Sequence, residues 1–191
     1  MFFFTKSELH LYFNSIHHPF TDYFFRFVTH IADGLFVGAI ILFLVFIRYR
    51  YALFLGLSFL FSSLIAQFFK KIVFPDFDRP KKFFESIAEL HYVPGVELHS
   101  FNSFPSGHAT SSFVLFCCLA FIVNSKYLKF TFFIIALTVA LSRVYLSQHF
   151  FMDIYFGSII GVVSTFAAYY IIQNTRKLNE NIWLDKSLMD S

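Results

Sequence analysis

The chain has 191 residues, of which 57% are hydrophobic and 23% aromatic, while only 14% are charged. Soluble globular domains carry about 25% charged residues, and a soluble fold of this length has no interior large enough for 32 phenylalanines. With a net charge of only +3, this composition excludes a disordered chain, a collagen and a nucleic-acid-binding domain. We therefore expect residues 1–191 to form a single domain that is embedded in lipid.

The first 30 residues predict two short helices that lie in the membrane interface. Thr5 to Glu8 have the form of a capping box, and apolar residues follow at helical spacing. Pro19 interrupts this pattern, and a second apolar run with two charges inserted follows it. A sixth, irregular membrane span is the alternative. We expect no signal peptide, because no basic segment precedes a long apolar stretch.

Charge-free stretches after residue 30 predict transmembrane helices, since a helix needs about 20 residues to cross the hydrocarbon layer. The five predicted spans are residues 31–48, 51–70, 108–125, 128–147 and 151–173. The predicted fold class is all-α: a polytopic transmembrane helical bundle of about five spans plus N-terminal interfacial helices. Cys117 and Cys118 are neighbours on one helix and point in different directions, so we expect no bond between them.

Basic residues in the connections predict how the chain is oriented. Arg48, Arg50, Lys126, Lys129 and the basic tail 174–191 fall on one side, which the positive-inside rule makes cytoplasmic. The N-terminus and the connections 71–107 and 143–150 then fall outside, yet they also contain basic residues beside membrane ends. We expect an anionic ligand to be the reason for this outer positive charge.

His149 and Asp153, at the start of the last span, carry the first indication of chemistry. They are four residues apart, so on a helix they share one face. An aspartate that accepts from one imidazole nitrogen leaves the other free to act as a nucleophile or base. Both groups are costly in lipid, so we expect them in a protein interior or a watery cleft. An interfacial pair that caps the helix is the alternative.

Two further outer segments are typical of phosphate binding. Residues 105–108, Pro-Ser-Gly-His, end a loop and begin a helix, where free N–H groups form an anion site and His108 can donate a proton to a leaving oxygen. Lys70, Lys71 and Arg79 follow the second span and offer point charges and a guanidinium fork. The alternatives are an ordinary helix start with an interfacial histidine and a pair of lysines that snorkel to the membrane edge.

Together the three segments resemble the motifs of the type 2 phosphatidic acid phosphatase (PAP2) family of integral-membrane lipid phosphatases. The family pattern is Lys-x6-Arg-Pro, then Pro-Ser-Gly-His, then Ser-Arg-x5-His-x3-Asp. The second motif is present at residues 105–108 and the third in full from Ser142 to Asp153. The first motif departs from the family spacing of six residues, because seven residues separate Lys71 from Arg79 and eight separate Lys70 from Arg79. We prefer Lys71, which is closer to the arginine.

The resemblance implies a role for each motif residue. His149 attacks phosphorus and becomes phosphorylated, Asp153 orients it, and His108 protonates the leaving oxygen and then activates water. The phosphate oxygens are bound by Lys71, Arg79, Ser106, Gly107, Arg143 and Ser142. No metal or other cofactor is expected.

The expected activity is hydrolysis of a terminal phosphate or diphosphate on a membrane lipid of the undecaprenyl diphosphate, phosphatidylglycerol phosphate, phosphatidate or lipid A type. The expected partners are this lipid phosphate substrate and membrane lipids, not nucleic acid. The expected location is a bacterial inner membrane, with the active site on the periplasmic face. A lipid phosphotransferase of the same family, or a non-catalytic phospholipid carrier or channel, is the alternative.

Overall fold

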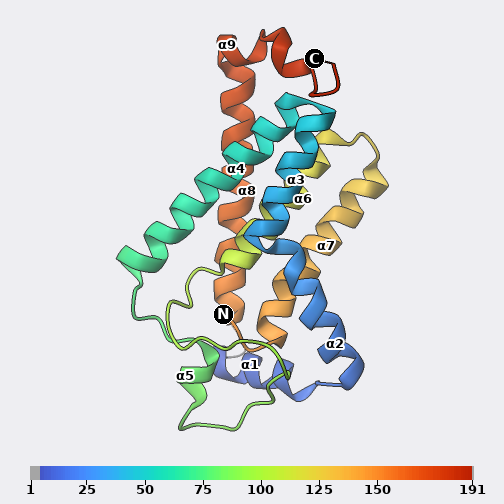
Figure 1. Ribbon diagram of the computed structural model, residues 1–191. Coiled ribbons are helices and arrows are strands. Elements are labelled where there is room, and N and C mark those ends of the chain that lie inside the picture. Colours follow the sequence, from blue (N-terminus) through green and yellow to red (C-terminus); the bar gives the residue numbers. More distant parts are fainter. Residues whose placement is uncertain (1–4, 191) are drawn as a thin grey trace.

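The computed structural model describes residues 5–190, which are helical with irregular connections and contain no strand (Figure 1). The predicted all-α class is confirmed. The N-terminal half comprises α1 (Lys6–Ser15), α2 (Pro19–Val28), the 3₁₀ turn η1 (Thr29–Ala32), α3 (Gly34–Ile47), α4 (Tyr49–Phe68), the π-helical turn η2 (Phe69–Val73) and α5 (Pro80–Phe84). The C-terminal half comprises α6 (Gly107–Ile122), α7 (Lys126–Tyr145), α8 (Phe151–Asn174), α9 (Arg176–Asn179) and the 3₁₀ turn η3 (Ile182–Asp185).

Both short N-terminal helices are present at the predicted places. The Thr5 side chain accepts from the backbone N–H of Glu8, and the Glu8 carboxylate accepts from the backbone N–H of Thr5, so the predicted capping box begins α1. Pro19 occupies the first turn of α2, where its missing N–H costs no hydrogen bond. The interfacial location of these helices stays a prediction.

Helices occupy all five predicted span positions, but fewer of them are long enough to cross a membrane. In the described part of the chain, three meet the length and hydropathy required: Tyr49–Val73, Lys126–Tyr145 and Phe151–Asn174. The helices Pro19–Ala32 and Gly34–Ile47 meet at a 52° bend. If they form one broken span, the described residues contain four candidate spans. The apolar helix α6 is shorter, with 16 residues. α3 begins at Gly34 rather than at residue 31, after the polar residue Asp33, and α6 ends at Ile122 rather than at residue 125.

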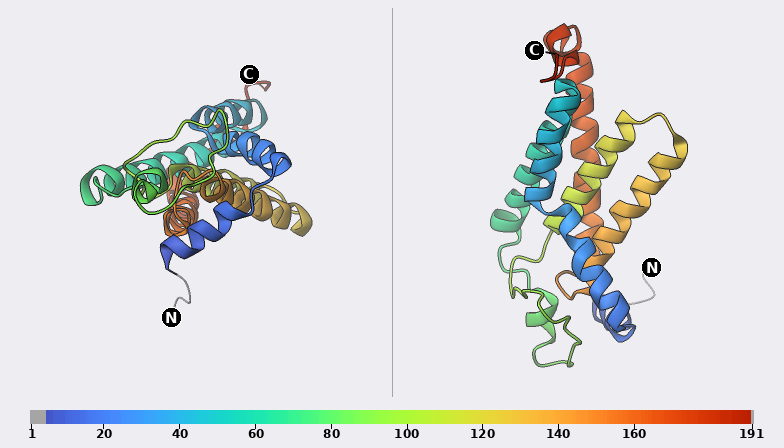
Figure 2. Two further views of the ribbon diagram at one scale, coloured as in Figure 1. Left: turned by 90° about the horizontal axis from the view of Figure 1, so that it is seen from below. Right: turned by 45° about the vertical axis from the view of Figure 1, so that its right-hand side comes forward.

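The centre of the bundle is α6, which packs against α4, α7 and α8 (Figure 2). The main core includes Leu55, Val114, Leu115 and Ala168, all fully buried. α8 approaches α6 closely at two glycines. A Cβ atom on Gly157 would lie 2.6 Å from the carbonyl oxygen of Ser106, and one on Gly161 would lie 2.6 Å from that of Thr110. These glycines bring the start of α6 beside the start of α8.

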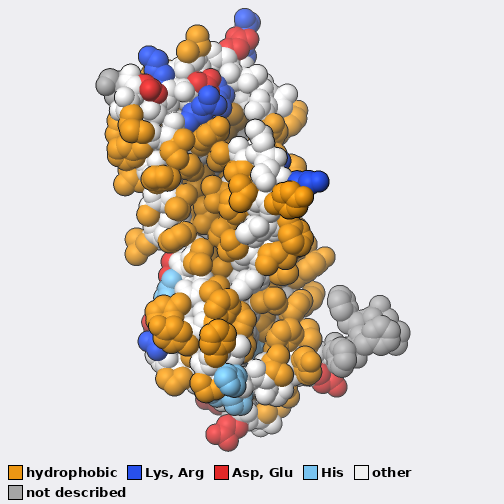
Figure 3. All heavy atoms as spheres, turned by 90° about the vertical axis from the view of Figure 1, so that its right-hand side faces the viewer, with side chains coloured by type: hydrophobic (Ala, Val, Ile, Leu, Met, Phe, Trp, Pro, Cys, Tyr) orange, Lys and Arg blue, Asp and Glu red, His pale blue; other side chains and the backbone are white. Residues whose placement is uncertain are grey.

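The connections fall at the two ends of the bundle in the grouping that the five predicted spans require. The α3–α4 junction, the α6–α7 connection and α9 lie at one end, whereas α1, α5 and the α7–α8 turn lie at the other (Figure 1). The surface between these ends is mainly hydrophobic, and charged side chains gather toward the ends (Figure 3). The tail is tied to its end by Arg50, which donates to the carbonyl oxygen of Leu178 and to Asp185.

Candidate active site

His149 lies in the tight turn that joins α7 to α8. The backbone N–H groups of Gln148 and His149 both donate to the carbonyl oxygen of Arg143, at 2.9 and 3.1 Å. Ser147 adopts a positive φ of 53°, and its hydroxyl contacts Nε2 of His10 and Nδ2 of Asn14, each at 3.2 Å. α1 lies across the ends of α7 and α8 and therefore holds the turn that carries His149 (Figure 1).

His149 faces Asp153, as their spacing predicted, although His149 precedes the first residue of α8. Nδ1 of His149 lies 3.5 Å from Oδ2 of Asp153 and has no hydrogen-bond partner among the described residues. Oδ2 accepts from the Ser103 hydroxyl at 2.5 Å and from the backbone N–H of Phe150 at 2.9 Å, so the carboxylate is fixed. Nδ1 is therefore the ring nitrogen that lies toward the carboxylate, and Nε2 lies on the other side of the ring.

The environment of His149 favours its neutral form. The residue is 2% exposed, and burial lowers its pKa well below the ordinary value. The positive charges of Arg79, Arg143 and Lys70 lower this pKa further. A neutral imidazole retains the lone pair that a nucleophile needs.

Two buried guanidinium groups stand beside His149. Nε of Arg79 donates to the carbonyl oxygen of Phe101 at 2.9 Å, and Nη1 donates to that of Gln148 at 3.1 Å. Nη1 of Arg143 donates to the Thr29 hydroxyl at 2.6 Å, while its Nε is buried without a hydrogen-bond partner in residues 5–190. Buried cations are stable only when an anion compensates them. Their accumulation around one histidine is therefore typical of an anion-binding site.

The structure places Lys70, and not the preferred Lys71, near the two arginines. The Lys70 side chain is partly buried and interacts electrostatically with Arg79, Arg143 and Asp153. Lys71 is exposed and lies beside Leu64 and Phe68, on the lipid-facing side of α4. The π-helical turn η2 rotates the chain differently from an α-helix, so distance along the sequence does not decide which lysine faces the arginine.

The start of α6 completes the cluster. Ser106 is the N-cap: its hydroxyl accepts from the N–H of Ala109 at 3.4 Å, and its own N–H donates to the carbonyl oxygen of Asp153 at 3.0 Å. A Cβ atom on Gly107 would meet nothing within 4 Å, so the backbone there is open to a ligand. His108 follows, and its Nε2 lies 2.6 Å from Oδ1 of Asp33.

Ser142 is placed differently from the other predicted residues. Its hydroxyl is fully buried and donates to the carbonyl oxygen of Val139, in its own helix, at 2.6 Å. This hydrogen bond is that of a helix-packing serine. Asp33, Thr29 and Ser103, which contact the cluster, were not predicted; only Asp33 gave a signal, as an acidic residue at the start of an apolar stretch.

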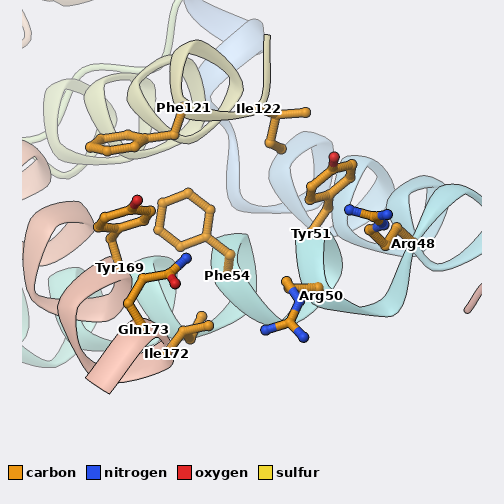
Figure 4. Close-up of a pocket in the computed structure, with 9 residues that line it drawn as sticks. All are labelled: Arg48, Arg50, Tyr51, Phe54, Phe121, Ile122, Tyr169, Ile172 and Gln173. Carbon is orange, nitrogen blue, oxygen red and sulfur yellow. The ribbon is translucent and has the colours of Figure 1, made fainter. Parts of the chain in front are cut away.

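A separate cavity of about 270 Å³ lies toward the opposite end of the bundle (Figure 4). Arg48, Tyr51, Tyr169 and Gln173 are among its lining residues. Its other arginine, Arg50, is bound to the C-terminal tail. Neither arginine belongs to the cluster around His149. Among residues 5–190, no group of three or more histidine, cysteine, aspartate or glutamate side chains is placed to hold a metal ion.

The sequence model of the PAP2 superfamily matches residues 51–177, more than half of the chain. The chain belongs to the PAP2 superfamily. The match includes all three motif segments and ends near the C-terminus of α8. This membership makes the protein a membrane phosphatase that hydrolyses phosphoric esters.

The chain is similar to three known proteins. A lipid A 4'-phosphatase of Bacteroides thetaiotaomicron is 28% identical over 171 residues, which cover 86% of this chain and 76% of the relative. The crystal structure of Aquifex aeolicus LpxE has a TM-score of 0.74 and 22% identity, with 85% of this chain and 93% of that chain covered. The transmembrane PAP2-type phosphatidylglycerolphosphate phosphatase of Bacillus subtilis also has a TM-score of 0.74 and 22% identity, over 90% of this chain and 86% of that chain. These two structures confirm the fold.

Proposed function

We propose that this PAP2 phosphatase removes a terminal phosphate from a membrane lipid through a phosphohistidine, with lipid A phosphate as the first candidate substrate. The observation that carries the proposal is the convergence of His149, Asp153 and the buried cations at the starts of α6 and α8. Lipid A phosphate comes first because the curated relative is a lipid A 4'-phosphatase.

In the first step, Nε2 of His149 attacks phosphorus. The new N–P bond forms as the P–O bond to the lipid breaks, and the departing oxygen takes a proton from His108. Asp153 stabilises the positive charge that develops on the imidazole. Arg79, Arg143 and Lys70, together with the N–H groups at the start of α6, stabilise the negative charge on the phosphate oxygens.

In the second step, water replaces the histidine on phosphorus. His108, now neutral, accepts a proton from water as the oxygen attacks, and the N–P bond breaks to release inorganic phosphate. Proton transfers to and from one histidine balance over the two steps, so the cycle returns His108 to its protonated form. Each step uses side chains of this chain, and we expect turnover without an added metal ion.

An apolar groove beside the cluster supports a lipid substrate. This groove, which we call the phenylalanine groove, has a volume of about 370 Å³ and is lined by Phe69, Phe74, Phe77, Phe104, Phe156, Ile159 and Ile160. Phe69 directly precedes Lys70, and Phe104 precedes the Pro-Ser-Gly-His segment. A hydrocarbon chain in the groove would therefore lie next to the segments that carry Lys70 and the Pro-Ser-Gly-His motif.

The charges at the ends of the bundle support a location for the site. By the positive-inside rule, the basic connections and tail face the cytoplasm in this proposal, and the cluster around His149 opens at the periplasmic end of a bacterial inner membrane. N-terminal helices α1 and α2 lie at this outer end, and the tail 174–191 lies at the cytoplasmic end.

The test is phosphate release by purified protein in detergent from a panel of lipids: lipid A, phosphatidylglycerol phosphate, undecaprenyl diphosphate and phosphatidate. We expect release from at least one lipid, undiminished by EDTA, and none from the His149→Ala variant. Loss of activity on chelation would contradict the metal-free mechanism. Binding of every lipid without release would favour a carrier, and transfer of label to a second lipid would favour a phosphotransferase.

A further inference from the structure

Asp33 contacts two histidine side chains instead of capping the helix that follows it. It is the N-cap of α3, yet its side chain makes no capping hydrogen bond. Oδ1 lies 2.6 Å from Nε2 of His108, and Oδ2 lies 2.7 Å from Nδ1 of His30. Both carboxylate oxygens are therefore directed away from their own helix and toward imidazole rings. Asp33 and His30 lie outside the residues 51–177 that match the family, so no motif assigns them.

The contact with Asp33 determines which nitrogen of His108 is free. A carboxylate can only accept, so Nε2 carries the hydrogen that it donates to Asp33. Nδ1 of His108 has no hydrogen-bond partner among the described residues, and it is the atom left to face a departing oxygen. The side chain of His108 is 30% exposed, whereas His149 is almost fully buried. His108 therefore stands at the open side of the cluster.

The surroundings of His108 explain what a nearby carboxylate contributes to acid catalysis. Burial first, and then the positive charges of Arg143 and Lys70, oppose the protonated imidazole that a general acid must be. Asp33 supplies negative charge at the same ring. The side chain of His30 is 66% exposed and holds the second carboxylate oxygen from the solvent side.

We propose that Asp33 is the positioning residue of the general acid–base His108, and that His30 in turn orients Asp33. The site then contains two histidine–carboxylate pairs, His149 with Asp153 for attack on phosphorus and His108 with Asp33 for proton transfer to the leaving oxygen. This inference rests on the proposed phosphatase function. Asp33 touches neither substrate nor phosphorus in this role and acts through the histidine.

The test compares two leaving groups in the first turnover, measured by rapid quench. One substrate is a long-chain alkyl phosphate, whose alkoxide must be protonated to leave, and the other is p-nitrophenyl phosphate, whose nitrophenolate leaves without a proton. In Asp33→Asn, we expect release of the alkyl alcohol to slow about 10²-fold, within the range of general acid catalysis, while release of nitrophenolate changes little. His30→Gln should shift the ratio of the two rates in the same direction by a smaller factor.

Asp22→Asn is the matched control, because Asp22 pairs with Nε2 of His91 at 2.9 Å on the same side of the bundle but does not contact His108. It should leave the ratio of the two rates at the wild-type value. An equal loss on both substrates in Asp33→Asn, or an unchanged ratio in Asp33→Asn and His30→Gln, would overturn the positioning role. Failure of the wild-type protein to release phosphate from any lipid of the panel described above would instead overturn the proposed function.

Discussion

Replacing Lys70 by alanine should damage activity far more than replacing its neighbour Lys71. Lys70 adds a charge beside Arg79 and Arg143, where the phosphate oxygens bind in the proposed mechanism. A hydrogen bond to a charged group contributes about 1.5–3 kcal/mol, and each 1.36 kcal/mol corresponds to about tenfold in rate. We therefore expect kcat/KM for the lipid phosphate to fall about 10- to 150-fold in Lys70→Ala.

Lys71→Ala is the control, because this side chain is exposed beside Leu64 and Phe68. Substitutions at such surface positions change free energies by no more than about 0.5 kcal/mol, which is about twofold in kcat/KM. The assay is initial-rate kinetics of both variants with one lipid phosphate in one detergent. A larger loss in Lys71→Ala, or equal losses in the two variants, would refute the assignment of Lys70.

Two other predictions concern packing and sidedness. Gly157→Ala should destabilise the protein by about 1–3 kcal/mol and lower its activity, because the new methyl group would lie 2.6 Å from the carbonyl oxygen of Ser106. Gly38→Ala, which has open space, should do neither, and thermal unfolding of both variants checks this. In a background without the two native cysteines, a membrane-impermeant thiol reagent should label a cysteine at Glu89 but not at Lys126 in intact cells. The reverse pattern would invert the orientation.

Features that depend on local spacing were predictable from the sequence. The capping box of α1, the N-cap Ser106 and the approach of Asp153 to His149 all involve residues three or four apart. Helix starts fix the first two relations locally, and His149, although it lies in the turn before α8, is close enough in sequence to face the first turn of that helix. The span positions were predictable for a similar reason, since hydropathy reports on lipid contact along each segment.

Features that depend on tertiary contacts were not predictable. Which lysine faces Arg79 depends on the π-helical turn η2, and hydropathy carries no signal for that turn. Asp33 reaches His108 across 75 residues of sequence because the chain bends between η1 and α3. Asn14 reaches Ser147 from α1 in the same way. A single sequence lists these polar residues but does not pair them.

The central claim is that His149 forms a covalent bond to phosphorus, and the most direct measurement is capture of that intermediate. His108→Ala and His149→Ala are each mixed with a radiolabelled phosphate ester that has a good leaving group, then denatured. His108→Ala should retain acid-labile label, because the activated ester needs no acid for the first step and the base for the second is missing. His149→Ala should retain none. Stable label on His149→Ala would contradict the account.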